Sequence, residues 1–356
     1  MNMAHEKQSK GQARSTTGLR RSLFLIALFI PFLLVMVNSL NARAAGGAAQ
    51  NPELVIGLEG CSKECHKVEA DIWKNTKHGL SLNKLPDSKK AMEITEKMGI
   101  KSFKREERCV TCHFTRQQDG NKIKTISGPS CEDCHGQGKE WSSVHGDFGG
   151  KDVTKSQESA AHKQARISRS EAAGMIKPDD LFKMVQNCFN CHLGHDEELV
   201  NKGGHTAGSD IELVSWTQGK VGDGESIRHN VWHTKSNDIA PAPRRRMLFV
   251  LGTLLEMEYA LRAVGRSTQK EDFAKTMARR AKKVSGKLTF INDTVAIPEI
   301  QATLSGLGQI KQQLKLNNAT ELNRLADLVA HQAKLLASNN DGSKWAALDA
   351  VMPFQP

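Results

Sequence analysis

All eight cysteines of this 356-residue chain stand in pairs, and a histidine directly follows each pair. In chain order we number the four sites first to fourth. They comprise Cys61, Cys65 and His66; Cys109, Cys112 and His113; Cys131, Cys134 and His135; and Cys188, Cys191 and His192. The last three have the C-x-x-C-H spacing of covalent c-type haem attachment, in which two thiols bond the haem and the histidine ligates its iron.

Zinc binding and a disulfide framework are the two alternative interpretations of paired cysteines. Zinc does not require a histidine after every pair, and a disulfide framework predicts no histidine at all. The first site has one extra residue between its cysteines, so the chain has to bulge there. We therefore predict four covalently bound haem c groups, each holding one iron.

Composition agrees with bound haem. Aromatic residues make up only 5% of the chain and hydrophobic residues 38%, which leaves a thin core unless large apolar groups fill it. The four sites fall within 132 residues, between Cys61 and His192. Because so few residues cannot wrap four haems separately, we expect the haems to pack against one another as a chain of redox centres. The mean hydropathy of −0.46 excludes a polytopic membrane protein.

Residues 1–44 have the pattern of an export segment. Five basic residues precede an apolar run from Leu23 to Val37, and small residues stand at Ala42 and Ala44. This pattern predicts cleavage after Ala44. The alternative is an uncleaved anchor that runs on to Leu40 and associates the protein with the membrane. Either route places the rest of the chain in the periplasm.

Charge and cysteine distribution divide the exported chain near residue 225. Residues 45–225 hold all eight cysteines, with 25 basic and 27 acidic residues. Residues 226–356 hold no cysteine, with 19 basic and 11 acidic residues. We interpret 45–225 as the tetrahaem cytochrome c domain and 226–356 as a basic helical domain. A nucleic-acid partner is not expected outside the cytoplasm.

The fold class expected is mainly α with little regular strand: a multihaem c-type cytochrome domain built around packed haems, plus a C-terminal helical bundle. Residues 85–108 suggest one helix, and residues 122–126 a short strand. In the tail, apolar residues at helical spacing predict helices over 247–264 and 322–336. Thr268 and Glu271 suggest a capping box, and Pro298 suits the first turn of a helix.

The sites and their surroundings resemble the tetrahaem cytochrome c-554 family over about residues 57–195. The matching residues are Cys65, His66, Lys67, Trp73, Thr76 and His78; Cys109, Val110, Cys112 and His113; Gly128 to Gly136; and His145. The resemblance implies periplasmic electron transfer. It implies as partners a donor like hydroxylamine oxidoreductase and a membrane quinone-linked or terminal cytochrome as acceptor. The first site and the tail are longer than in the family's short members.

The same resemblance implies which further histidines ligate iron. It gives His78 as the distal ligand of the third haem and His145 as that of the first. For the fourth haem, His162 and His205 remain alternatives, with a preference for His205. The resemblance also implies that the second haem lacks a strong sixth ligand. His195 is expected at the surface.

Two functions from different classes follow. The first is an electron carrier, favoured by a dense haem array without another catalytic constellation. The second is a haem enzyme that reduces or oxidises nitric oxide, nitrite or hydroxylamine at one open iron. The single tyrosine, Tyr259, lies in the tail, so nothing supports the tyrosine cross-link of a hydroxylamine oxidoreductase.

Overall fold

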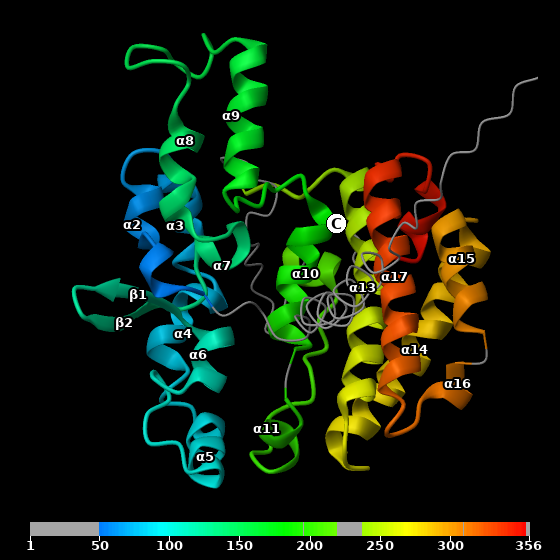
Figure 1. Cartoon of the computed structure of the whole chain (residues 1–356). Helices are drawn as coiled ribbons and strands as arrows, with labels where there is room; N and C mark the ends of the chain where they lie inside the picture. The colour runs from blue at the N-terminus through cyan, green and yellow to red at the C-terminus, as the bar shows by residue number, and fades with distance from the viewer. Residues whose placement is uncertain (1–49, 195, 219–236, 309, 354–356) are drawn as a thin grey trace, which may run out of the picture. The chain divides into compact units, whose positions relative to one another are not determined.

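A computed structural model describes residues 50–194, 196–218, 237–308 and 310–353 (Figure 1). The expected export segment, His195 and the expected domain boundary near residue 225 lie outside these ranges. The described residues are mainly helical with little strand, as the sequence predicted, and their strands form one antiparallel hairpin. Among them, no helix combines the length and the apolar character that a membrane span needs.

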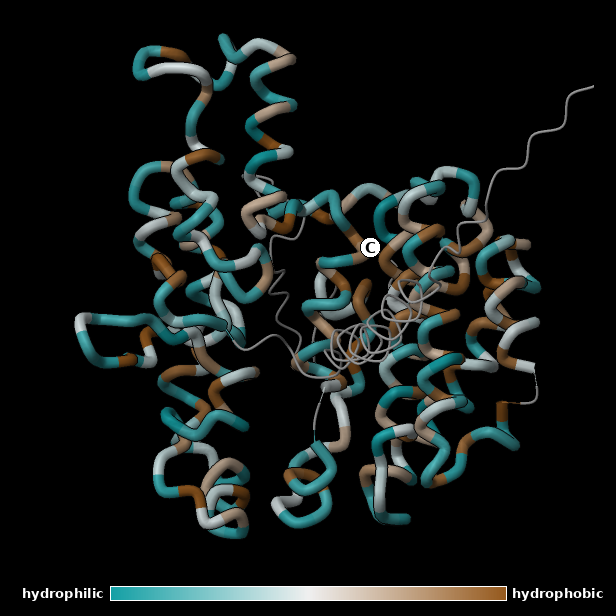
Figure 2. The backbone as a smooth tube through the Cα atoms, in the orientation of Figure 1, coloured by the Kyte–Doolittle hydropathy of each residue, from teal (hydrophilic) through white to brown (hydrophobic). Residues whose placement is uncertain are grey.

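The N-terminal part of the described chain consists of short helices around one hairpin. The α-helices are α2 Gly57–Ser62, α3 Lys67–Trp73, α4 Lys77–Lys84, α5 Lys89–Met98, α6 Glu107–His113, α7 Cys131–His135, α8 Ser142–Gly146, α9 Ala160–Ala172, α10 Leu181–His192, α11 Glu197–Asn201 and α12 Leu213–Gln218. The strands are β1 Thr115–Asp119 and β2 Lys122–Ser127, and 3-10 turns cover Pro52–Leu54 and Gly138–Glu140. Figure 2 draws the hairpin mostly in hydrophilic colours. Strand β2 confirms the strand expected over 122–126.

Long helices make up the C-terminal part. They are α13 Ala242–Arg266, α14 Asp272–Thr294, α15 Pro298–Leu307, α16 Ile310–Gln313 and α17 Ala319–Asn339, followed by a 3-10 turn at Ala346–Ala350. Helix α13 is buried over most of its circumference because α14, α17 and α10 all pack on it. The expected helices over 247–264 and 322–336 are confirmed, and Pro298 is the first residue of α15.

One continuous apolar cluster extends from Val185 on α10 to Met352 near the C-terminus. It includes Phe189, which lies between the cysteines of the fourth site and is 1% exposed. Consequently the fourth site shares its core with the C-terminal helices, and residues 45–356 form one compact unit. Only the cysteine and charge distributions separate the two parts of the sequence.

Two local predictions were wrong. Residues 85–108 do not form one helix: α5 begins after its N-cap Ser88 and ends at Gly99, whose φ of 66° is the left-handed conformation that glycine favours. Thr268 does not cap α14 with Glu271. Its backbone N–H and its hydroxyl both donate to the carboxylate of Glu197, each at 2.8 Å, and so hold α11 beside the start of α14.

Candidate haem-binding site

The regular sites all lie at the C-terminal end of a helix. His113, His135 and His192 are the last residues of α6, α7 and α10. A helical turn places the two cysteines of a C-x-x-C pair three residues apart on one face, with the histidine in the same last turn. Each helix thus presents two thiols and one imidazole together where its backbone ends.

The first site accommodates its extra residue by widening the turn. The backbone N–H of His66 donates to the carbonyl of Cys61, five residues earlier, at 3.1 Å. This is the hydrogen bond of a single π turn, which absorbs one residue more than an α turn. The chain after α2 therefore bulges as predicted, and His66 still follows Cys65 at the end of the turn.

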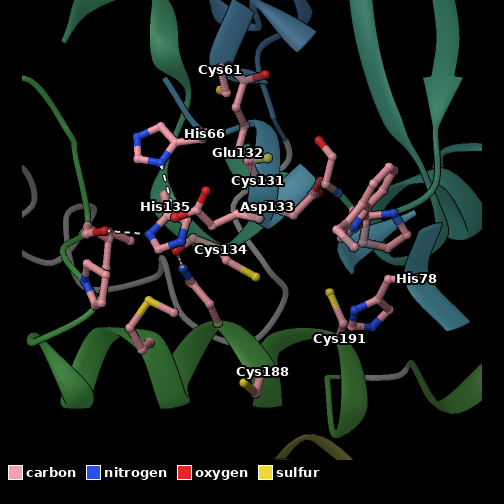
Figure 3. Close-up of a pocket in the computed structure, with 18 of the residues that line it drawn as sticks. Cys61, His66, His78, Cys131, Glu132, Asp133, Cys134, His135, Cys188 and Cys191 are labelled. Carbon is pink, nitrogen blue, oxygen red and sulfur yellow. Dashed lines mark hydrogen bonds and ion pairs between the residues drawn. The ribbon is translucent and has the colours of Figure 1, made fainter. Parts of the chain in front are cut away.

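The sites converge on one cavity of about 2290 Å³ (Figure 3). Seven of the eight cysteines line it, together with seven histidines: His66, His78, His113, His135, His145, His192 and His205. Cys109 lines a smaller adjoining space of about 120 Å³, together with His113 and His205. Pockets for single small molecules measure about 300–1,000 Å³. This cavity therefore has room for several large groups and fits the haems that the motifs require.

Contacts between cysteines show which sites are neighbours. The Cys61 thiol of the first site lies beside the Cys131 thiol of the third, and the Cys112 thiol of the second lies beside the Cys191 thiol of the fourth. Burial, followed by the nearby thiol of Cys188 in the fourth site, raises the pKa of Cys134 in the third. Figure 3 shows Cys61, Cys131, Cys134 and Cys188 in succession down the cavity. The sites are thus ordered first, third, fourth, second in space.

Within the described part of the chain, His66, His113 and His192 each face another histidine across the cavity. Ring centroids are 6.3 Å apart for His66 and His145, 6.1 Å for His78 and His192, and 6.2 Å for His113 and His205. A metal–imidazole bond is about 2 Å long and the bonding nitrogen lies about 1 Å from its ring centre, so one metal between two rings separates their centroids by about 6 Å. All three separations leave room for one iron.

These positions change the ligand assignments that the resemblance implied. His145 does face the first site, as implied. His78 faces His192 of the fourth site rather than the third, and His205 faces His113 of the second site rather than the fourth. The second site, expected to lack a sixth ligand, thus has a histidine opposite. That each of these residues ligates iron stays a prediction.

Two attachment imidazoles, those of His113 and His192, are neutral at pH 7, and hydrogen bonds orient two further rings for metal binding. Burial, followed by neighbouring imidazoles, lowers the pKa of His113 and of His192 to about 4. Nδ1 of His135 lies 2.9 Å from the carbonyl of Ile176, and Nδ1 of His205 lies 2.9 Å from that of Thr206. A ring that donates its Nδ1 proton to such an acceptor presents Nε2 as the metal ligand. Opposite His66, Nδ1 of His145 is buried with no hydrogen-bond partner.

His162 occupies a different place from the one expected. It does not line the large cavity, and its Nδ1 lies 2.7 Å from Glu158 Oε1. The same buried carboxylate accepts two hydrogen bonds from Arg166, both at 2.7 Å. Arg166 in turn donates to the carbonyl of His145 at 2.7 Å. His162 therefore belongs to a charged cluster that fixes α9 beside the residue facing the first site.

The two residues between the cysteines of the third site have structural roles that the attachment motif does not indicate. The Glu132 carboxylate accepts from the backbone N–H groups of Ile56, Gly57 and Gly138 at 2.7–3.0 Å. It thereby holds the start of the described chain against α7. Asp133 accepts from the backbone N–H of Ser130, its helix N-cap, at 2.7 Å. The Ser-x-x-acid spacing before α7 was a readable capping signal for Asp133.

No disulfide joins any of the eight cysteines. In the described ranges, no three His, Cys, Asp or Glu side chains gather in a group that could hold a metal ion by themselves. The donors are instead spread around a large apolar space, an arrangement that suits a macrocycle bringing its own four nitrogen ligands to iron.

Comparison with known proteins identifies relatives for the N-terminal half. Residues 61–136 match the family model described as cytochrome c554 and c-prime. The chain is 28% identical over 148 residues to cytochrome c-554 of Nitrosomonas europaea, a match that covers 39% of this chain and 58% of that relative. The matched stretch thus spans less than two thirds of the relative. No solved structure matches the chain.

Proposed function

We propose that this chain, whose residues 61–136 match the family model described as cytochrome c554 and c-prime, binds four haems c and transfers electrons through them. The observation that carries the proposal is convergence: four attachment sites open into one cavity, and three of their histidines face a second histidine at 6.1–6.3 Å. Two strong imidazole ligands per iron favour electron transfer over substrate binding, because they fill both axial positions.

The residues assigned to each haem follow from the geometry. His66 and His145 would hold the first iron, His113 and His205 the second, and His78 and His192 the fourth. His135 would hold the third from one side. When bound, each haem supplies an iron that alternates between the ferric and ferrous states.

The order of the sites gives the route. Because the first and third, third and fourth, and fourth and second sites adjoin, electrons that enter at the first haem leave at the second, or the reverse. Both ends of the row then lie at sites with two histidines. We further propose that the protein works in the periplasm, between a donor like hydroxylamine oxidoreductase and a quinone-linked acceptor in the membrane.

A single purified sample tests the proposal. The intact mass should show four haems per chain, and a redox titration followed by absorption should resolve four one-electron steps. Fewer haems would contradict the assignment of the site that lacks one. A protein that carries four haems but exchanges electrons with no small redox mediator would contradict electron transfer.

A further inference from the structure

The fourth site is built against the C-terminal helices. Phe189 and Asn190, the two residues between its cysteines, both contact Tyr259 on α13. The rings of Phe189 and Tyr259 meet edge to face with centroids 5.9 Å apart, and the Tyr259 hydroxyl donates to Oδ1 of Asn190. Since both motif residues are engaged, α13 fixes the helix end that carries His192.

A second contact reaches the ligand itself. Ser209 is joined to His192 twice: its backbone N–H donates to the His192 carbonyl at 2.9 Å, and its hydroxyl lies 2.9 Å from Nδ1 of the ring. If Nε2 ligates iron, Nδ1 carries the proton and donates to the hydroxyl oxygen. The Ser209 hydroxyl is then the acceptor that sets the orientation of this ring and its electron-donating strength.

Arg280 on α14 holds Ser209 in place. One terminal nitrogen of its guanidinium donates to the Ser209 carbonyl at 2.8 Å, and the other donates to Oε1 of Glu256 on α13 at 2.7 Å. The Arg280 side chain is only 9% exposed. Gly208, with φ of +80°, presses the loop against Met277 and Arg280 of α14. The Arg280 guanidinium on α14 therefore connects this helix to α13 and to the loop beside the fourth site.

We propose that Arg280 and Ser209 are positioning residues through which the C-terminal helices orient His192 and set the redox potential of the fourth haem. The inference rests on the proposed function, since it requires haem at that site. Donation from Nδ1 makes an imidazole more basic, and a more basic ligand stabilises ferric iron and lowers the potential. The tail then controls one step in the row of four, next to the second haem at its end.

Ser209→Ala tests the hydroxyl, with Ser209→Thr as the conservative variant that keeps it. We expect Ser209→Ala to shift one of the four midpoint potentials upward and to change the EPR g-values of one low-spin haem, and Ser209→Thr to restore both. A tenfold change in the relative stability of the ferric and ferrous states equals 59 mV for a one-electron couple. His78→Ala identifies the affected haem, because it removes the same low-spin signal.

Arg280→Met tests the link from α14, with Arg279→Met as the matched control. Arg279 is the exposed neighbour on the same helix and donates to Thr276 within it, so its removal takes away the same charge without loosening Ser209. We expect the Arg280 variant to move the same potential in the same direction, and the control to move none. If Arg280→Met does not fold, the midpoint potentials of Ser209→Ala and Ser209→Thr test the inference.

Two results would overturn the inference, and they differ from failure of the proposed function. Four unmoved potentials in Ser209→Ala, with four haems present by mass, would refute the inference and leave electron transfer intact. A uniform shift of all four potentials, or one equal in Arg279→Met, would show a general charge effect instead. Wild-type protein without haem on Cys188 and Cys191 would refute the proposed function at this site.

Discussion

Gly128 lies where β2 passes the helix that carries His78, and replacing it with alanine should detach that histidine from the fourth haem. A Cβ at position 128 would lie 2.0 Å from the carbonyl oxygen of His78 and 2.1 Å from Oγ of Ser81. Real Cβ atoms essentially never approach another atom closer than 3.0 Å. The backbone at His78 or at Gly128 must therefore move by about 1 Å, because the serine side chain can turn away but the carbonyl cannot.

A displacement of this size exceeds what a metal bond tolerates. Ligand distances in functional metal sites vary by only about 0.2 Å around their preferred values. The centroids of the His78 and His192 rings are 6.1 Å apart, which just fits one iron bonded to both rings. A shift of either ring by about 1 Å would therefore break one of the two metal bonds. We thus expect Gly128→Ala to lose the distal ligand of the fourth haem, with an overpacking cost of about 1–3 kcal/mol in stability.

Absorption and EPR spectra of the ferric protein measure the outcome. The high-spin content should rise by one haem per chain, while the mass still shows four. His78→Ala should give the same spectrum. The double variant should show no further high-spin haem, because both changes remove the same contact between His78 and the fourth haem. Gly286→Ala is the control: a Cβ on this exposed glycine of α14 would meet nothing within 4 Å, so alanine should leave the spectrum unchanged. A fully low-spin fourth haem in Gly128→Ala would refute the assignment of His78.

Three further predictions concern other parts of the site. Replacing Cys61 and Cys65 with alanine should lower the intact mass by one haem; an unchanged mass would mean that the widened first site is not used. His205→Ala should open the second haem, so that the reduced variant binds about one nitric oxide per chain more than the reduced wild-type protein; equal binding by the two proteins would contradict the assignment of His205. Hydrogen bonds from Arg166 and His162 lower the pKa of Glu158 to about 2, so its contribution to stability is present above the unfolded value near 4.5 and is lost as the pH falls through 2. Thermal melts across this range should be less pH-dependent in Glu158→Gln, and an identical dependence would argue against the cluster.

The attachment chemistry was readable from the sequence because it is local. Two thiols and a histidine within five or six residues act through one helical turn, and the extra residue of the first site predicted its bulge. Helix periodicity likewise located α13 and α17, since a buried helix repeats its apolar residues every three to four positions. Pro298 and the hairpin strand followed from equally local preferences.

Tertiary structure alone decided which histidines meet. His78 lies twelve residues after His66, yet its ring faces His192, and the close approach of Gly128 to the His78 carbonyl holds α4 against the end of β2. The sequence allowed His162 as an alternative to His205. In the structure, Nδ1 of His162 lies 2.7 Å from Glu158 Oε1, so this ring belongs to the charged cluster around Glu158. Sequence separation carries no information about such pairs, since loops bring any two segments together at a similar entropic cost.

The relation between the tail and the haem sites was also a matter of packing. Charge and cysteine counts separate residues 226–356 from the rest of the chain. Neither quantity shows that apolar residues of α10 pack into the same core as the C-terminal helices. Arg280 and Ser209 are 71 residues apart and belong to no motif, so only the fold joins them to His192. The sequence by itself indicated covalent c-type haems and predicted four attachment sites; the packing of α13 and α14 decided what surrounds the fourth site.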